Sequence, residues 1–149
     1  MEQRTRKDFI TRTHKLLEQY DSFHLNIEEK YEITLRLNAC VGLLLVGQQH
    51  LKRAIPLDDL ENIGLLSKNV LVCKDHKTGE DEDVNTQSLS RHLRNSIAHA
   101  RFEFINEKKM IKSIRFRDKK GRTTTFDMIL TSDEFITYTD WLFDVFTKP

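Results

Sequence analysis

The sequence is poor in the residues that build disulfide frameworks, turn-dense sheets and membrane spans. Its 149 residues include two cysteines, five glycines and two prolines. Cys40 and Cys73 alone cannot form a disulfide framework or a four-thiolate zinc site. The scarcity of glycine and proline excludes collagen-like, linker-like and turn-dense all-β chains, and it favours helices. The longest apolar run spans nine residues, 39–47, whereas a membrane span needs about 20.

No secretory signal leads the chain, because residues 1–15 are charged throughout and contain no apolar segment. We therefore expect a reduced, cytoplasmic protein. Apolar residues make up 38% of the chain, charged residues make up 32%, and nine residues are Phe. This composition excludes a disordered chain and predicts one soluble globular domain over residues 1–149.

Charge is distributed unevenly, although the net charge is only +1. Residues 54–85 hold eight Asp or Glu against three Lys or Arg, and residues 86–122 hold eleven Lys or Arg against three Asp or Glu. One quarter of the chain is thus strongly basic. Such asymmetry indicates a polyanionic partner, but a solvated, lysine-rich hairpin would explain it equally well.

Hydrophobic periodicity predicts a mainly α fold. We expect helices over residues 4–21, 26–53, 57–65, 86–100 and 133–147, and strands over residues 101–106, 110–118 and 122–130. The helix over 26–53 is apolar nearly all round its middle, so it should be the most buried one. Apart from the short helix over 57–65, the chain between residues 56 and 85 should be irregular. The prediction is a helical bundle with a three-stranded antiparallel β-meander inserted before the last helix.

The helix over residues 86–100 carries the most informative pattern. On a helical wheel, one narrow arc is apolar and should face the core: Leu89, Leu93, Ile97 and Ala100. Ser88, Asn95 and His99 lie near the opposite side, and the side chain of Arg94 can reach them. An arginine binds phosphate oxygens, an imidazole exchanges protons near neutral pH, and an asparagine can orient either group. Equally, a polar helix face of this kind can simply meet water.

Residues 94–99 read R-N-x-x-x-H and resemble the signature of the HEPN superfamily, in which a polar residue follows the arginine directly and the histidine lies five positions after it. Leu93 before the arginine and Phe102 after the histidine match the same context. The apolar helix upstream and the basic hairpin at 113–117 resemble a small, stand-alone branch associated with plasmids and defence, over most of residues 28–147. One departure is Ala100, where the family often has glycine.

The resemblance implies a HEPN-like bundle and a metal-independent endoribonuclease, acting as a toxin or an anti-phage effector. Members are typically homodimers whose motif helices face one another. His99 would then act as acid and base, Arg94 would stabilise the charge of the scissile phosphate, and Asn95 would position the groups. Attack by the RNA 2′-OH would leave a 2′,3′-cyclic phosphate and a 5′-OH. The resemblance also implies a protein partner, which would be an antitoxin or a larger defence-system protein.

Seven residues are candidate RNA contacts beside the motif: Arg91, His92, Arg101, Lys109, Lys112, Arg115 and Arg117. We expect no metal and no cofactor, because the acids of residues 80–83 resemble a solvated loop, His76 has no partner at ligand spacing, and the glycines are isolated. The alternative function is a catalytically silent, dimeric module that binds RNA or another protein.

Overall fold

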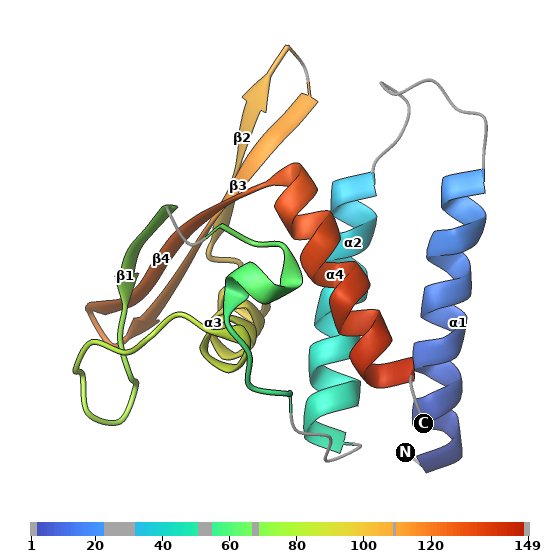
Figure 1. Cartoon of the computed structure of the whole chain (residues 1–149), viewed down its shortest axis with the longest axis horizontal. Coiled ribbons are helices and arrows are strands. Elements are labelled where there is room, and N and C mark those ends of the chain that lie inside the picture. Colours follow the sequence, from blue (N-terminus) through green and yellow to red (C-terminus); the bar gives the residue numbers. More distant parts are fainter. Residues whose placement is uncertain (1–2, 23–31, 51–54, 67–68, 109, 148–149) are drawn as a thin grey trace.

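The structure is a computed structural model that describes residues 3–22, 32–50, 55–66, 69–108 and 110–147. Its elements in chain order are α1 (Gln3–Ser22), α2 (Glu32–Gly42), the π-helical segment η2 (Leu43–His50), the 3-10 helix η3 (Leu60–Ile63), β1 (Val70–Cys73), α3 (Thr86–Ala98), β2 (Phe102–Glu107), β3 (Met110–Lys120), β4 (Thr123–Thr131) and α4 (Ser132–Thr147) (Figure 1). Within these ranges, every helix is too short or too polar to cross a lipid bilayer.

The sheet has four antiparallel strands in the order β1-β4-β3-β2, so the prediction of a three-stranded meander is wrong. The meander itself forms from β2, β3 and β4, and the extra strand is β1, which we expected to be irregular chain. β1 has only four residues, too few to establish a period of two along the sequence. It is a strand because Val70 and Cys73 pair with Met128 and Phe126 of β4, a contact that local sequence does not encode.

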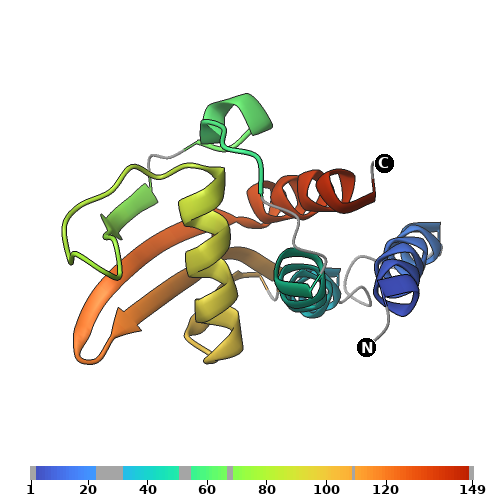
Figure 2. The ribbon, with the colours of Figure 1, turned by 90° about the horizontal axis from the view of Figure 1, so that it is seen from below.

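The core lies between one face of the sheet and the helices. Figure 2 shows α3 lying across this face, and both views place α2 and α4 between the sheet and α1. Five sheet side chains on this face are fully buried: Ile114, Phe116, Phe126, Met128 and Leu130. Burial of each such side chain contributes about 1.5–3 kcal/mol relative to exposure. Leu89 and Leu93 of α3 and Phe135 of α4 are buried in the same core.

The helix expected over 26–53 is confirmed as the central one, because Cys40, Leu43 and Leu44 are fully buried. It is not α-helical throughout, however, since the chain continues from α2 into the wider π-helical turns of η2. An apolar run without a polar face does not reveal which turn geometry it adopts. The expected ends of this helix lie outside the described residues. α1 packs against the middle of this helix at Gly42. The Phe9 ring of α1 comes so close there that a Cβ atom on Gly42 would lie only 2.9 Å from it.

Candidate functional site

The helix that carries the motif begins at a well-defined cap. The side chain of Asn85 accepts hydrogen bonds from the backbone N–H groups of Gln87 and Ser88, at 3.0 and 2.9 Å. The Ser88 hydroxyl in turn accepts from the Asn85 N–H at 2.9 Å, which completes a reciprocal capping box. This local cap therefore fixes the residue at which α3 begins, and with it the direction in which each position of the helix faces.

α3 ends at the motif histidine. His99 is the C-cap, the N–H of Ala100 donates to Ile97 O, and the N–H of Arg101 donates to Ser96 O at 2.7 Å. This pair of bonds is a Schellman motif, which requires a left-handed residue after the C-cap. Ala100 fills that place with φ +52°. A glycine at this position would therefore fit the backbone better than the alanine that stands here.

The three motif residues occupy different environments. Arg94 and Asn95 are half-buried on α3, whereas His99 is exposed at its end. Arg94 Nη2 donates to Asn95 Oδ1 at 3.4 Å, and Asn95 Nδ2 donates to Asp118 Oδ2 at 3.0 Å. The His99 imidazole makes no hydrogen bond to any described residue. Asn95 is thus held from inside the protein, while His99 is available to a ligand or to a second subunit.

Asp118 connects the motif to the interior. It follows Ile114 and Phe116 at alternate positions of β3, so its side chain points into the core and the residue is 1% exposed. Its Oδ2 accepts from His76 Nε2 at 2.7 Å and from His92 Nδ1 at 3.0 Å, in addition to Asn95. Burial alone would raise the pKa of Asp118, but the hydrogen bonds from His92, Asn95 and His76 outweigh it and lower the pKa to about 2. A buried anion therefore sits directly beneath the motif.

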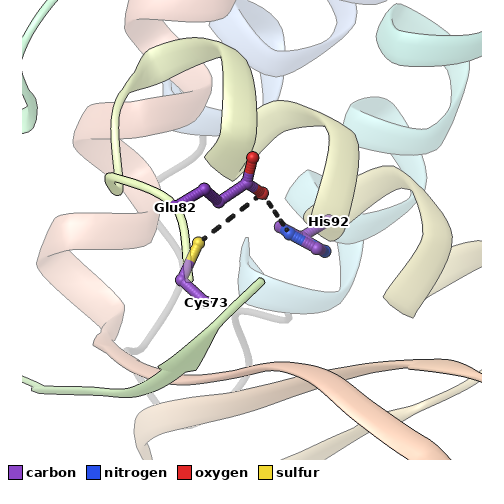
Figure 3. A group of neighbouring side chains, drawn as sticks. All are labelled: Cys73, Glu82 and His92. Carbon is purple, nitrogen blue, oxygen red and sulfur yellow. Dashed lines mark hydrogen bonds and ion pairs between the residues drawn. The ribbon is translucent and has the colours of Figure 1, made fainter. Parts of the chain in front are cut away.

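His92, one of the predicted RNA contacts, lies inside the protein, so its side chain does not offer RNA a direct contact. The residue is fully buried, and its ring stacks on Phe126 with a centroid distance of 4.6 Å. Its Nε2 lies 3.0 Å from Glu82 Oε1, to which the thiol of Cys73 also donates across 3.8 Å (Figure 3). We call Cys73, Glu82 and His92 the Cys–Glu–His cluster. Arg91 Nη2 contacts Glu82 Oε1 and lies 3.2 Å from His92 Nε2.

Sequence reasoning missed most of this interior network. Glu82 was expected to be solvated, but it bonds Arg91 and His92, and His76 does have a partner in Asp118. Ser88 was expected on the outer face but is 3% exposed. The error arises because α3 contacts β3, α2 and η2 together, which buries an arc wider than its apolar stripe. Of these residues, Asp118 is the one whose burial the sequence indicates, because it continues the alternation of inward-facing positions that Ile114 and Phe116 begin.

Only some of the residues predicted to contact RNA lie close together in the structure. A shallow depression of about 250 Å³ opens beside the end of α3, and we call it the basic depression; its lining is Ala100, Arg101, Phe102, Glu103, Arg115, Arg117 and Lys119. Arg115 donates to Asp127 from Nε and Nη2 at 2.8 and 2.7 Å, so its Nη1 remains for a ligand. Lys112 lies outside the depression and pairs with Glu107 at 2.6 Å, and Lys109 lies outside the described residues.

Comparison with known proteins gives one finding. The model of a protein family described as HEPN pEK499 p136 matches residues 1–148. Searches of curated proteins and of solved structures return no match to this chain.

Proposed function

Because this chain belongs to the HEPN pEK499 p136 family, we propose that it is a metal-independent endoribonuclease of the HEPN type, with Arg94, Asn95 and His99 as its catalytic residues. Membership of the HEPN superfamily favours a nuclease-like or RNA-binding module. The proposal goes further in naming the reaction and its residues, and in placing the protein in the cytoplasm as a toxin or defence effector.

The observation that carries the proposal is the position of His99. The exposed imidazole closes α3, and the next residue, Ala100, already lines the basic depression. Arg101, Arg117 and Lys119 bring positive charge to this depression, and Phe102 adds an aromatic face. Cationic groups bind a ribose-phosphate backbone, and aromatic rings stack unpaired bases. A strand of RNA that lies in the depression would bring a phosphate next to His99.

The proposed reaction needs no group beyond the chain and the RNA. The ribose 2′-OH loses its proton to a His99 imidazole and attacks the adjacent phosphorus, and the P–O5′ bond breaks. The leaving 5′-oxygen takes a proton from the second His99 of a homodimer, so the products are a 2′,3′-cyclic phosphate and a 5′-OH. Arg94 neutralises the phosphate charge in the transition state. Asn95, held by Asp118, keeps Arg94 in place through its Oδ1.

The test is cleavage of a single-stranded RNA in the presence of EDTA. The wild-type chain should yield fragments with 5′-OH ends that polynucleotide kinase labels directly, and His99→Ala should be slower by roughly 10²-fold or more. A substrate with a 2′-deoxy sugar at the cleaved position should resist cleavage, because it lacks the nucleophile. His14→Gln and Arg12→Lys are matched controls on α1, and they should cleave as the wild type does.

Equal cleavage by the wild type and His99→Ala would contradict the proposal, and so would cleavage of the 2′-deoxy substrate. An antitoxin or a defence-system partner is a proposed regulator, so the chain should be assayed both alone and after co-expression with its neighbouring gene products.

A second candidate is a catalytically silent module that binds RNA or a protein. It is favoured by three large apolar side chains that are exposed on the β2–β3 hairpin: Phe104, Ile105 and Met110. In this case Arg94→Ala and His99→Ala would leave partner binding unchanged, while Phe104→Ser would weaken it.

A further inference from the structure

Three potential metal ligands from separate segments converge on one point. Cys73 ends β1, Glu82 belongs to the loop before α3, and His92 lies on α3, with their ligand atoms all within 4.8 Å of one another (Figure 3). Glu82 N donates to Cys73 O at 3.0 Å, and Asp75 N donates to Glu80 O at 2.9 Å. The segment between Cys73 and Glu82 is therefore a backbone-bonded hairpin that holds these two side chains opposite each other.

The contact of His92 with β3 determines which ring nitrogen faces the cluster. Nδ1 lies 3.0 Å from Asp118 Oδ2, so Nε2 is the nitrogen on the side of Glu82, 3.0 Å from Glu82 Oε1. The Arg91 guanidinium reaches the same point, because its Nη2 contacts Glu82 Oε1 and lies 3.2 Å from His92 Nε2. A cationic group therefore already lies beside both of these ligand atoms.

We propose that Cys73, Glu82 and His92 bind a Zn²⁺ ion, which takes the place of the Arg91 guanidinium beside Glu82 and His92. Thiolate, imidazole and carboxylate are zinc ligands, with bonds of about 2.0–2.3 Å. Tetrahedral coordination with these bond lengths places the ligand atoms about 3.3–3.6 Å apart. His92 Nε2 and Glu82 Oε1, now 3.0 Å apart, would therefore separate slightly, and Cys73 Sγ, now 3.8 Å from Glu82 Oε1, would move closer. The Cys73 thiol releases its proton to solvent. The fourth position is open toward Arg91, whose side chain is 34% exposed.

Asp118 supplies the outer support that such a site needs. Metal-bound histidines usually donate their other ring N–H to a carboxylate, which fixes the tautomer and orients the ring. The bond from His92 Nδ1 to Asp118 and the stacking on Phe126 already do both. Zinc would thus fasten the 73–82 hairpin to α3, and it would free Arg91 to contact a phosphate.

The neighbouring group of His76, His92 and Asp118 is a weaker candidate. Its shared acceptor, Asp118 Oδ2, already takes hydrogen bonds from His76, His92 and Asn95. An ion there would have to displace these donors, whereas the Cys–Glu–His cluster would exchange one cation for another. His76→Gln therefore serves as a control that should leave the site intact.

The probe is Co²⁺, which reports a thiolate ligand by a charge-transfer band in the near ultraviolet. The full chain, stripped of metal, should bind one equivalent with this band, and Zn²⁺ should abolish the band by competition. The band should persist in Cys40→Ser and His76→Gln. It should disappear in Cys73→Ser, and in Glu82→Gln the affinity should fall on the order of 100-fold. Arg91→Met should bind about tenfold or more tightly, because its charged group no longer competes.

Several results would overturn the zinc site. They are a wild-type chain without the band, a band that survives Cys73→Ser, or an affinity that does not rise in Arg91→Met. If Cys73→Ser fails to fold, as judged by circular dichroism, Glu82→Gln and Arg91→Met decide the question. The nuclease proposal is tested separately, since its cleavage proceeds in EDTA and depends on His99.

Discussion

At the scale of single residues, Asp118 carries the most interactions of the candidate site. Its carboxylate, which belongs to a residue that is 1% exposed, joins His76, His92 and Asn95. We expect Asp118→Asn to lower the free energy of unfolding by about 3 kcal/mol, because an amide cannot accept all these bonds and leaves buried donors unpaired. Urea unfolding measures this, with the exposed Asp144→Asn as control. A loss equal to that of the control would show that the network adds no stability.

Asp127 predicts a dependence of stability on pH. The hydrogen bonds from Arg115 are the largest of the effects that lower its pKa below the ordinary 3.8. A carboxyl with a lowered native pKa stabilises the fold fully above its ordinary pKa, and this contribution is lost as the pH falls through the native value. Asp127→Asn should therefore be less stable than the wild type at neutral pH, and the difference should shrink as the pH falls below the ordinary pKa of 3.8. A difference that is constant with pH would contradict this origin.

The residues predicted from the sequence and those missed differ in how far apart their partners lie. Arg94 and Asn95 lie on α3 and His99 is its C-cap, so their spacing along one segment was enough to predict them as a group. The cluster residues Cys73 and Glu82 reach His92 only after β1 has paired with β4 and the hairpin has closed. No spacing rule links such segments, so the interior network becomes visible only in the folded chain.

At the scale of elements, the end of α3 is strained by one methyl group. Ala100 adopts a left-handed conformation that costs an ordinary L-residue about 1 kcal/mol or more, and glycine avoids this cost but gains entropy in the unfolded chain. We expect Ala100→Gly to raise the free energy of unfolding by roughly 0.5 kcal/mol. Ala98→Gly, two residues earlier and still helical, should lower it by about 1 kcal/mol. Two changes of the same sign would refute the assignment of the helix end.

Helix positions were largely predictable because apolar periodicity and caps are local signals. The expected helix over 86–100 and the observed α3 share their start, which Asn85 sets by bonding two N–H groups. β1 and the π-helical turns of η2 were not predictable, since one depends on its partner strand and the other lies in an unpatterned apolar run. Local chemistry thus defines the motif helix, while long-range pairing defines the sheet edge beside it.

At the scale of the whole molecule, the proposed nuclease is incomplete as a single chain. One chain offers one exposed His99 and one Arg94, whereas the proposed reaction uses one imidazole to accept a proton and another to donate one. A twofold dimer supplies both if the ends of two α3 helices meet. Activity should then fall on dilution below the dissociation constant of the dimer, in parallel with the loss of dimer measured by analytical ultracentrifugation.

The shared cleft predicts that a subunit without His99 inactivates its wild-type partner. A mixed dimer of the wild type and His99→Ala contains one intact His99, whereas the proposed reaction uses two, so this dimer should be inactive. Random exchange between equal amounts of the two chains leaves about one quarter of the dimers fully wild type, and cleavage should fall to about one quarter of that of the undiluted wild-type chain. If exchange is verified by mass spectrometry and the mixture retains about half of the activity, each subunit acts alone and the two do not share one cleft.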